Sequence, residues 1–254
     1  MQLDGSVVVV TGGGNGIGAA LSRRFADRGA AVVVNDLDAD ACRAVADEIG
    51  GLAVPGDAAS QEGVDALVRA ADEQHGRIDV FCANAGIGQA GGPEADEDAW
   101  ARSWDINVMA HVRAARAVLP QWLERGRGRF LATVSAAGLL TMLGSAPYSV
   151  SKHAALAFAE WMAITYADRG ITVQALCPQG VRTNLLDDSG ETGKLLLGDT
   201  AITPGEVADD VLTALDDDRF LILPHPEVAQ YYALRATDPG RWQAGMRKLQ
   251  RGLP

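Results

Sequence analysis

The sequence predicts an α/β fold in which one doubly wound, mostly parallel sheet is covered by helices on both faces. Short apolar runs alternate with segments of helical periodicity along the chain, and a glycine-rich loop follows the first run. Parallel neighbouring strands require right-handed crossovers, which place helices on the faces of the sheet. The length of 254 residues allows one domain or two smaller ones. Because no Pro/Gly/Ser-rich linker interrupts the alternation, we expect a single domain over 1–254.

Each expected element has a local signal. Val7–Val10 is a β-branched run that ends at glycines, and Ala19, Leu21 and Phe25 follow it at helical spacing. The segment 184–203 breaks the rhythm with glycines around an apolar leucine run, so we interpret it as a mobile substrate flap. Residues 224–254 form a C-terminal extension. Further strands are expected at 31–35, 52–54, 78–83, 129–134, 171–176 and 220–223, and further helices at 39–49, 64–71, 100–123, 148–166 and 206–215.

Composition excludes several classes of function. The formal net charge of −11 repels polyphosphate backbones and anionic lipid surfaces, so neither a nucleic-acid nor a membrane partner is expected. Cys42, Cys82 and Cys177 are odd in number and widely spaced, which indicates reduced core thiols rather than a disulfide framework. The four histidines lack the spacing of a metal site, so no metal is expected. No basic leader or membrane-length apolar run is present, and we expect a cytoplasmic protein.

The loop Thr11–Gly18 lies between the first expected strand and helix. Backbone N–H groups and the helix dipole at such a junction can receive a pyrophosphate, and glycines are needed because a Cβ would block its approach. The alternative is an ordinary tight turn. Its place at the first strand, together with an acidic residue after the second, favours a dinucleotide site. The expected contacts are Gly12, Asn15, Gly16, Ile17 and Gly18.

Asp36, at the end of the second strand, indicates which dinucleotide binds. A carboxylate there accepts hydrogen bonds from the ribose hydroxyls of NAD and repels the 2′-phosphate of NADP. Leu37, the next residue, adds no positive charge for a phosphate, and we interpret Arg23 and Arg24 as solvated surface charges. The sequence therefore favours NAD as the cofactor, with Asp36 and Leu37 beside the adenosine.

Tyr148 and Lys152 stand four residues apart in an expected helix and share one of its faces. A tyrosine with a pKa near 10 is a poor base, but a lysine ammonium and an oxidised nicotinamide both favour the phenolate. Ser135 ends a strand at the carboxyl edge of the sheet, where it could hydrogen bond the reacting oxygen. A lone Tyr-x-x-x-Lys pair is usually plain helix surface. Here the accompanying loop and serine favour a catalytic set.

With these motifs the chain resembles the classical short-chain dehydrogenase/reductase family over nearly its whole length. The resemblance implies a Rossmann-type sheet of about seven strands, hydride exchange with nicotinamide, and a tetrad of Asn107, Ser135, Tyr148 and Lys152. Asn107 would support a water that leads from Lys152 to solvent. The motifs that carry the resemblance are Thr11-Gly12-x-x-x-Gly16-Ile17-Gly18, Asn84-Ala85-Gly86, Asn107, Ser135, Tyr148 with Lys152, and Pro178–Thr183. Further implied cofactor contacts are Asp57, Ala58, Asn84, Ala85, Gly86, Tyr148, Lys152, Pro178, Gly180, Val181 and Thr183.

The chain departs from the family pattern at two positions. Ala83 stands where many relatives have an asparagine, and Gln179 stands where many have a glycine after the proline. Two implied roles also have plainer alternatives. Asp57 could cap a turn instead of contacting adenine, and Asn107 could be a helix-kink residue.

The expected activity is interconversion of a secondary alcohol and its ketone, with Tyr148 exchanging the hydroxyl proton. An NADP-dependent carbonyl reductase and a non-catalytic dinucleotide-binding protein remain alternatives, as does an epimerase or dehydratase, which would normally carry a larger C-terminal domain. Residues 139–143, mostly apolar, are either core or the wall of a pocket for a small apolar alcohol or ketone. Extra apolar and small residues on helices 100–123 and 148–166 predict a homo-oligomer. The family resemblance implies that these helices pair across a two-fold axis, as a dimer or, commonly, a tetramer.

Overall fold

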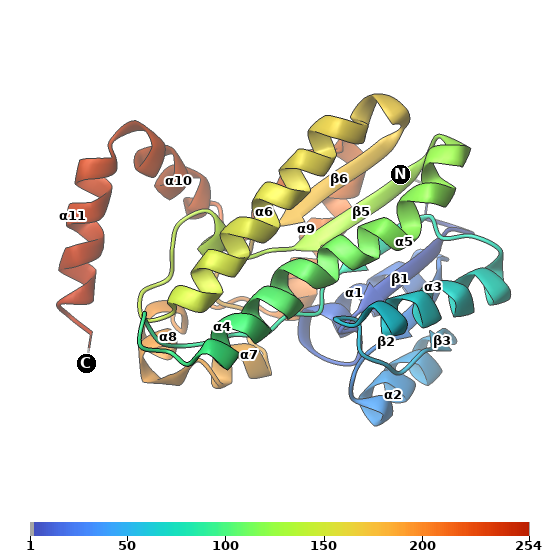
Figure 1. Ribbon diagram of the computed structural model, residues 1–254, viewed down its shortest axis with the longest axis horizontal. Coiled ribbons are helices and arrows are strands. Elements are labelled where there is room, and N and C mark those ends of the chain that lie inside the picture. The colour runs from blue at the N-terminus through green and yellow to red at the C-terminus, as the bar shows by residue number, and fades with distance from the viewer. Residues whose placement is uncertain (1–2, 254) are drawn as a thin grey trace.

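A computed structural model describes residues 3–253, and its centre is a seven-stranded parallel sheet (Figure 1). The strand order is β3-β2-β1-β4-β5-β6-β7. Because β2 and β3 lie on one side of β1 and β4 to β7 on the other, the order of the strands reverses at the boundary between β1 and β4. In such sheets ligands bind beyond the carboxyl ends of the strands at this reversal. The strands are β1 (Val7–Thr11), β2 (Ala31–Asn35), β3 (Leu52–Ala53), β4 (Val80–Ala83), β5 (Gly128–Thr133), β6 (Ile171–Leu176) and β7 (Leu221–Ile222).

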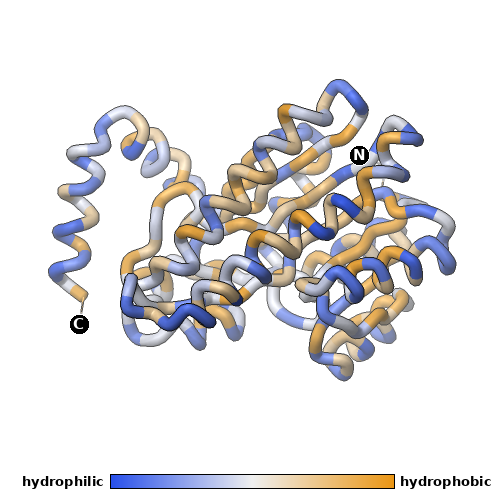
Figure 2. Tube along the Cα trace, in the orientation of Figure 1, coloured by the Kyte–Doolittle hydropathy of each residue, from blue (hydrophilic) through white to orange (hydrophobic). Residues whose placement is uncertain are grey.

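Two hydrophobic cores lie on opposite faces of this sheet. The side chains of Val7 and Val9 enter one core and those of Val8 and Val10 the other, because successive side chains of a strand alternate between faces. Figure 2 shows hydrophobic residues concentrated along the strands. One core is covered by α3 (Gln61–His75), α5 (Ala110–Arg125) and α6 (Ala146–Tyr166), and the other by α1 (Gly16–Asp27), α2 (Ala39–Ile49) and α9 (Pro204–Asp217).

The helix expected over 100–123 is interrupted. It consists of α4 (Glu97–Trp104), a π-helical turn (Asp105–Met109) and α5. Apolar periodicity does not reveal one extra residue in a turn, so the sequence predicted a continuous helix. The edge strands β3 and β7 are also shorter than expected, with two residues each, because each has only one neighbouring strand to pair with.

Four helices occupy segments for which the sequence predicted none. The flap segment contains α7 (Asn184–Asp187) and α8 (Gly190–Leu197), and the C-terminal extension contains α10 (Glu227–Thr237) and α11 (Pro239–Gln250). Figure 1 shows α11 set apart from the sheet, and no residue of α11 is buried. None of the helices between residues 3 and 253 is long and apolar enough to cross a lipid bilayer.

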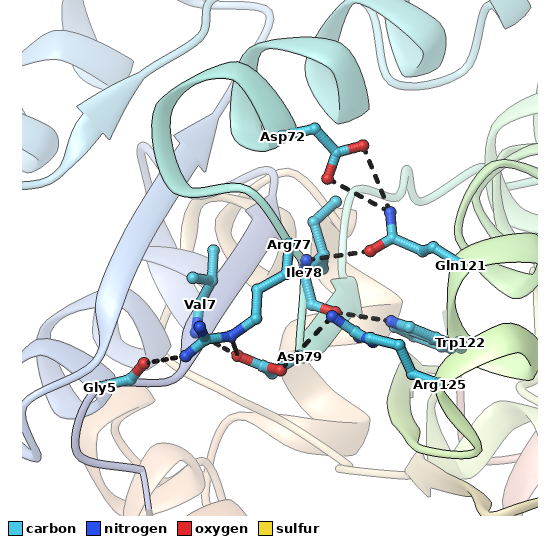
Figure 3. A network of polar contacts seen from close by, with 9 residues as sticks. All are labelled: Gly5, Val7, Asp72, Arg77, Ile78, Asp79, Gln121, Trp122 and Arg125. Atoms are coloured by element: carbon cyan, nitrogen blue, oxygen red, sulfur yellow. Dashed lines mark hydrogen bonds and ion pairs between the residues drawn. The ribbon is translucent and has the colours of Figure 1, made fainter.

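The amino edge of the sheet is closed by a network of polar contacts (Figure 3). The Asp79 carboxylate accepts hydrogen bonds from the Val7 backbone N–H at 2.9 Å and from Arg77 Nε at 2.8 Å. Trp122 Nε1 donates to the Ile78 carbonyl at 2.8 Å. These contacts join β1, the start of β4 and α5 at the end of the sheet remote from the strand ends where a ligand is expected.

Candidate active site

The start of α1 is shaped to receive an anionic group. Its N-cap residue, Asn15, makes no side-chain hydrogen bond to the helix, and the first turn carries no acidic residue. The first N–H groups of a helix lack partners within the helix, so here they face outward together with the dipole. Gly12 has a φ of +62°, and a Cβ there would approach Ala85 Cα to 3.0 Å. A cavity of about 470 Å³ opens beside this loop, lined in part by Gly16, Arg182 and Thr183.

Asp36 follows β2 and lies against the same loop. Its Oδ2 accepts a hydrogen bond from the Gly14 N–H at 2.9 Å, and its Oδ1 accepts one from the Asp38 N–H at 3.0 Å. The carboxylate is therefore held beside the glycine loop, where a ribose could reach it. The neighbouring Leu37 is 77% exposed and contributes no charge.

Arg23 and Arg24 are on the surface, as the sequence indicated, but neither is simply solvated. Arg23 forms a two-pronged ion pair with Glu48 of α2, with both contacts at 2.7 Å, and Arg24 Nε pairs with Asp209 of α9 at 2.6 Å. Both arginines also line the cavity beside the glycine loop. Their pairing with carboxylates leaves less positive charge for an additional phosphate.

Asn84 ties together the carboxyl ends of three strands. Its Nδ2 donates to the Thr11 carbonyl at 3.0 Å, and its Oδ1 accepts from Thr133 Oγ1 at 3.0 Å. Thr11 Oγ1 accepts in turn from the N–H groups of Asn84 and Ala85. Sequence reasoning singled out Asn84 but not Thr133, whose hydroxyl carries no signal until β5 is placed beside β4. This hydrogen-bond network leads to Gly86, where a Cβ would lie 3.2 Å from Lys152 Nζ.

Ser135 and Tyr148 meet at the carboxyl edge of the sheet. Ser135 follows β5, Tyr148 lies in the first turn of α6, and their hydroxyl groups share a hydrogen bond. Burial raises the pKa of Tyr148, and the hydrogen bond from Ser135 lowers it by less. The lowering expected from Lys152 is thus not supplied by the chain's own residues. The phenol is a proton donor until another positive charge comes near.

Lys152 lies one turn further along α6 and is only 3% exposed. Its Nζ donates to the Thr133 carbonyl at 3.1 Å and stands 5.7 Å from the centre of the Tyr148 ring. Burial lowers the pKa of Lys152 to about 8. None of the carboxylates in the described part of the chain offsets this cost. A buried lysine without a carboxylate partner is a candidate functional residue.

Asn107 lies in the π-helical turn and is fully buried. Its Oδ1 accepts from the Ile87 N–H at 2.9 Å, while its Nδ2 donates to the Ile87 carbonyl at 3.0 Å and to Ser151 Oγ at 3.0 Å. The side chain therefore fastens the segment after β4 to α6. Single π-turns inside helices are frequent at functional sites. The kink and a role at the site coexist in this residue.

This arrangement matches a known family of enzymes. A family model described as short chain dehydrogenase matches residues 6–194. The chain belongs to the short chain dehydrogenase family. It is accordingly an oxidoreductase that acts on hydroxyl groups.

Several relatives cover most of this dehydrogenase. A 1-deoxy-11-beta-hydroxypentalenate dehydrogenase from Streptomyces exfoliatus is 38% identical over 237 residues, which span 89% of this chain and 86% of the relative. A (2S)-[(R)-hydroxy(phenyl)methyl]succinyl-CoA dehydrogenase subunit from Thauera aromatica is 30% identical, spanning 86% and 92%. The crystal structure of a short chain dehydrogenase/reductase from Burkholderia phymatum in complex with NAD gives a TM-score of 0.86 at 28% identity, spanning 94% and 95%.

The two departures from the family pattern have structural explanations. Ala83 is a buried β4 residue in the core beneath α5, so its side chain packs instead of bonding. Gln179 of this dehydrogenase turns towards the C-terminal extension. Its N–H donates to His225 Nδ1 at 3.2 Å, and its Nε2 donates to Glu227 Oε1 at 3.2 Å. No feature of the sequence pointed to His225.

The remaining predicted cofactor contacts, in the loop 178–183, lie beside the glycine loop and the segment after Ser135. The Pro178 carbonyl accepts from the Ala136 N–H at 2.8 Å. Thr183 stands over the start of α1, since a Cβ on Gly16 would meet its Cγ2 at 3.0 Å. Gly180 and Val181 connect these two points. The sequence-predicted residues of this loop therefore connect the segment after Ser135 with the start of α1.

Two groups of residues lie away from this centre. Asp57 Oδ1 accepts from the Ala59 N–H at 2.9 Å in a local turn after β3, and Ala58 is buried behind it. Leu139 and Leu140 belong to the hydrophobic core, so the pocket-wall alternative fails for these two. Met142 and Leu143 remain partly exposed. The three cysteines are free and buried, as predicted, and burial raises the pKa of Cys177 to about 12.

Proposed function

We propose that this protein is an NAD-dependent dehydrogenase that interconverts a secondary alcohol and its ketone, with Tyr148 as the acid and base. The observation that carries the proposal is the meeting of Ser135, Tyr148 and buried Lys152 at the strand ends next to an uncapped helix start. A purely dinucleotide-binding protein would have no use for an uncompensated lysine beside a tyrosine.

Ser135 and Tyr148 would act on one oxygen atom of the substrate. Their hydroxyl groups hydrogen bond to each other, so an alcohol oxygen placed between them is in reach of both. In the oxidation direction Tyr148 accepts the hydroxyl proton, and Ser135 donates a hydrogen bond to the same oxygen. In the reduction direction the protonated phenol returns that proton. Oxidised nicotinamide, when bound, would supply the acceptor for the hydride that leaves the alcohol carbon.

Lys152 and Asn107 prepare this proton exchange. The Lys152 ammonium is held by the Thr133 carbonyl next to Gly86, and it remains mostly protonated at neutral pH, below its pKa of about 8. Its charge favours the Tyr148 phenolate once a cofactor ribose and pyridinium complete the surroundings. Asn107 hydrogen bonds the Ile87 backbone and Ser151, and thereby holds the segment after β4 against α6.

NAD is proposed over NADP because of Asp36. Its carboxylate is fixed by the Gly14 and Asp38 N–H groups, and a 2′-phosphate there would meet a like charge. The arginines nearest the loop, Arg23 and Arg24, are paired with Glu48 and Asp209. The glycine cradle fits the pyrophosphate through backbone N–H groups alone.

The substrate is proposed to be an apolar, ring-bearing alcohol. Leu185 and Leu195 of the flap are 45% and 60% exposed, and Leu185 lies against Gly88 beside the site. Met142 approaches the flap at Gly193. Exposed apolar side chains around a cleft favour a hydrophobic ligand. Two relatives are named for hydroxylated substrates, a hydroxypentalenate and a hydroxy(phenyl)methyl succinyl-CoA, and the second carries a phenyl ring.

A homo-oligomer is proposed from the outer faces of α4 and α6. Trp104 is 48% exposed, and Trp161 and Ile164 are 55% and 77% exposed. Ala155, on the opposite side of α6, is buried in the core. Large exposed apolar side chains on neighbouring helices favour association. Sedimentation at micromolar concentration should show a dimer or tetramer, and a monomer alone would contradict this.

An activity assay tests the proposed function. Purified protein is incubated with NAD or NADP and a panel of secondary alcohols that includes hydroxylated terpenoid acids, hydroxysteroids and small aliphatic alcohols. We expect reduced nicotinamide to form with NAD and the ring-bearing alcohols, and none with Tyr148→Phe. Binding of NAD without turnover of any alcohol or ketone would instead favour the non-catalytic alternative, and preference for NADP would favour a carbonyl reductase.

A further inference from the structure

His225 is a buried histidine that the proposed reaction does not use. It lies between β7 and α10 and is 3% exposed. Its Nδ1 meets the Gln179 backbone nitrogen at 3.2 Å, and its Nε2 meets the Thr200 carbonyl oxygen at 3.2 Å. One ring thus bridges two segments that are 21 residues apart in the chain.

These two contacts fix the form of the imidazole. A backbone N–H can only donate and a carbonyl oxygen can only accept, so Nδ1 accepts from Gln179 and Nε2 carries the proton that it donates to Thr200. His225 is therefore a neutral ring with both nitrogens satisfied. A buried polar side chain of this kind fixes the relative position of its two partners.

The two partners stand at the base of the flap, residues 184–203. Gln179 belongs to the loop 178–183 that leads into the flap, and Thr200 lies near the flap's end. The two sides of the base are also joined directly, since the Arg182 N–H donates to the Ile202 carbonyl at 2.9 Å and the Ile202 N–H to the Gly180 carbonyl at 3.1 Å. His225 adds a further connection next to these backbone hydrogen bonds, because it contacts Gln179 on one side and Thr200 on the other.

The same base connects to both halves of the proposed site. Loop 178–183 reaches Ala136 beside the catalytic serine and carries Thr183 over the start of α1. On its other side the flap brings Leu185 against Gly88. A displacement at the base would consequently move the cofactor contacts and the substrate cover together.

We propose that His225 is a positioning residue that pins the flap base, holding loop 178–183 through Nδ1 and the end of the flap through Nε2. The role assigned to loop 178–183 rests on the proposed function. Gln179, the departure from the family's glycine, extends the pin through its side-chain contact with Glu227 at 3.2 Å. The C-terminal extension thereby sets the position of a loop that contacts cofactor.

Two conservative variants separate the two contacts. In His225→Asn the side-chain oxygen overlies Nδ1, so the Gln179 contact is kept and the Thr200 contact is lost. In His225→Gln the amide nitrogen overlies Nε2, so the Thr200 contact is kept and the Gln179 contact is lost. His225→Phe removes both while filling the same space. His75→Phe, at the end of α3 near the amino edge of the sheet, is the matched control.

The readouts are the dissociation constant for NAD, by calorimetry, and the initial rate of tryptic cleavage after Lys194, the only lysine or arginine in the flap. We expect His225→Gln to weaken NAD binding about fivefold with normal cleavage, the equivalent of one neutral hydrogen bond. His225→Asn should accelerate cleavage about fivefold with normal NAD binding. His225→Phe should show both changes, and His75→Phe neither.

The proposal is overturned if His225→Asn and His225→Gln show the same changes in NAD dissociation constant and cleavage rate, or if neither variant differs from wild type. Equal loss in all three His225 variants, together with a lowered melting temperature, would show a merely structural residue and also overturn it. Failure of the proposed function looks different. Wild type would then bind no NAD, while the cleavage assay would still distinguish His225→Asn from His225→Gln.

Discussion

The amino edge and the carboxyl edge of the sheet, where the strands begin and end, differ in how their polar groups are paired. At the amino edge, Asp79 is surrounded by the Val7 N–H, Arg77 and Arg125, and each charge has a partner (Figure 3). At the carboxyl edge, α1 starts without a cap and Lys152 is buried with only a carbonyl acceptor. Both edges belong to the same strands.

This difference in pairing predicts that residues at the amino edge contribute mainly to stability and residues at the carboxyl edge mainly to activity. At the amino edge, hydrogen bonds and ion pairs to Asp79 join the start of β1 to β4 and α5 and so contribute to stability. At the carboxyl edge, the first N–H groups of α1 and the buried Lys152 ammonium are the groups that the proposed cofactor would contact. Substitutions at the two edges should therefore fail in different ways, and the predictions below test that separation.

The largest effect is expected for Tyr148→Phe. Loss of the proton path should lower kcat by about a hundredfold to ten-thousandfold, while the ring's packing and the melting temperature stay unchanged. NAD affinity should change by no more than about twofold, because the glycine loop and Asp36 are untouched. Steady-state rates, calorimetry and thermal unfolding measure the three quantities. Tyr166→Phe, at the other end of α6, is the control with normal turnover. Near-normal kcat in Tyr148→Phe would remove Tyr148 from the mechanism.

Asp36 should set cofactor choice with the next largest effect. Wild type is expected to prefer NAD by about a hundredfold in kcat/KM, equivalent to about 2.7 kcal/mol. Asp36→Asn retains an acceptor for the Gly14 N–H but removes the charge, so it should reduce the preference without loosening the loop. Asp36→Ala should lose affinity for NAD as well, and adding Leu37→Arg should move the preference towards NADP. A ratio that stays constant across this series would exclude Asp36 as the ribose ligand.

Asp79→Ala should damage only stability. Removing the carboxylate leaves the Val7 N–H and two arginines without their acceptor, which should cost about 2–4 kcal/mol and lower Tm by roughly 5–10 °C. Turnover by the folded fraction should stay normal. Asp40→Ala, which removes a fully exposed partner of Arg43, should change stability by less than about 1 kcal/mol. A catalytic defect in folded Asp79→Ala would break the separation of the two edges.

Lys152→Met should show the reverse of Asp79→Ala: the free energy of unfolding should rise while catalytic activity is lost. A pKa lowered from 10.5 to about 8 means that burying the charge costs about 3 kcal/mol. The cost is complete below pH 8, where folded and unfolded chains are both protonated. It is relieved as pH rises from 8 towards 10.5, because the folded protein releases its proton first.

The stability gain of Lys152→Met should therefore be about 1–3 kcal/mol near pH 7 and should shrink towards pH 10. Part of the gain is offset because the Thr133 carbonyl loses its donor. Denaturant unfolding of both proteins at several pH values measures the difference. A gain that grew with pH would mean that Lys152 is not held at a lowered pKa.

The sequence by itself determined the strands, the glycine loop and the positions of Asp36, Ser135, Tyr148 and Lys152. These follow from local rules: alternation in strands, helical spacing, and the need for glycine where a backbone approaches a ligand. Spacing alone placed Tyr148 and Lys152 on one helix face. Their relation to Ser135 followed from the order of β5 and the next helix, because the end of the strand and the start of that helix lie at the same end of the sheet.

Only the tertiary structure decided the rest. The Asn107 side chain in the π-helical turn hydrogen bonds Ile87, and apolar periodicity predicts neither the turn nor this contact. Thr133, Gln179 and His225 acquire partners 49, 46 and 25 residues away, so their neighbourhood in the sequence carries no sign of them. The direction in which the pKa of Tyr148 shifts depends on burial, which only the packed structure shows. Local pattern specifies elements, whereas long-range packing specifies polar partners and charge.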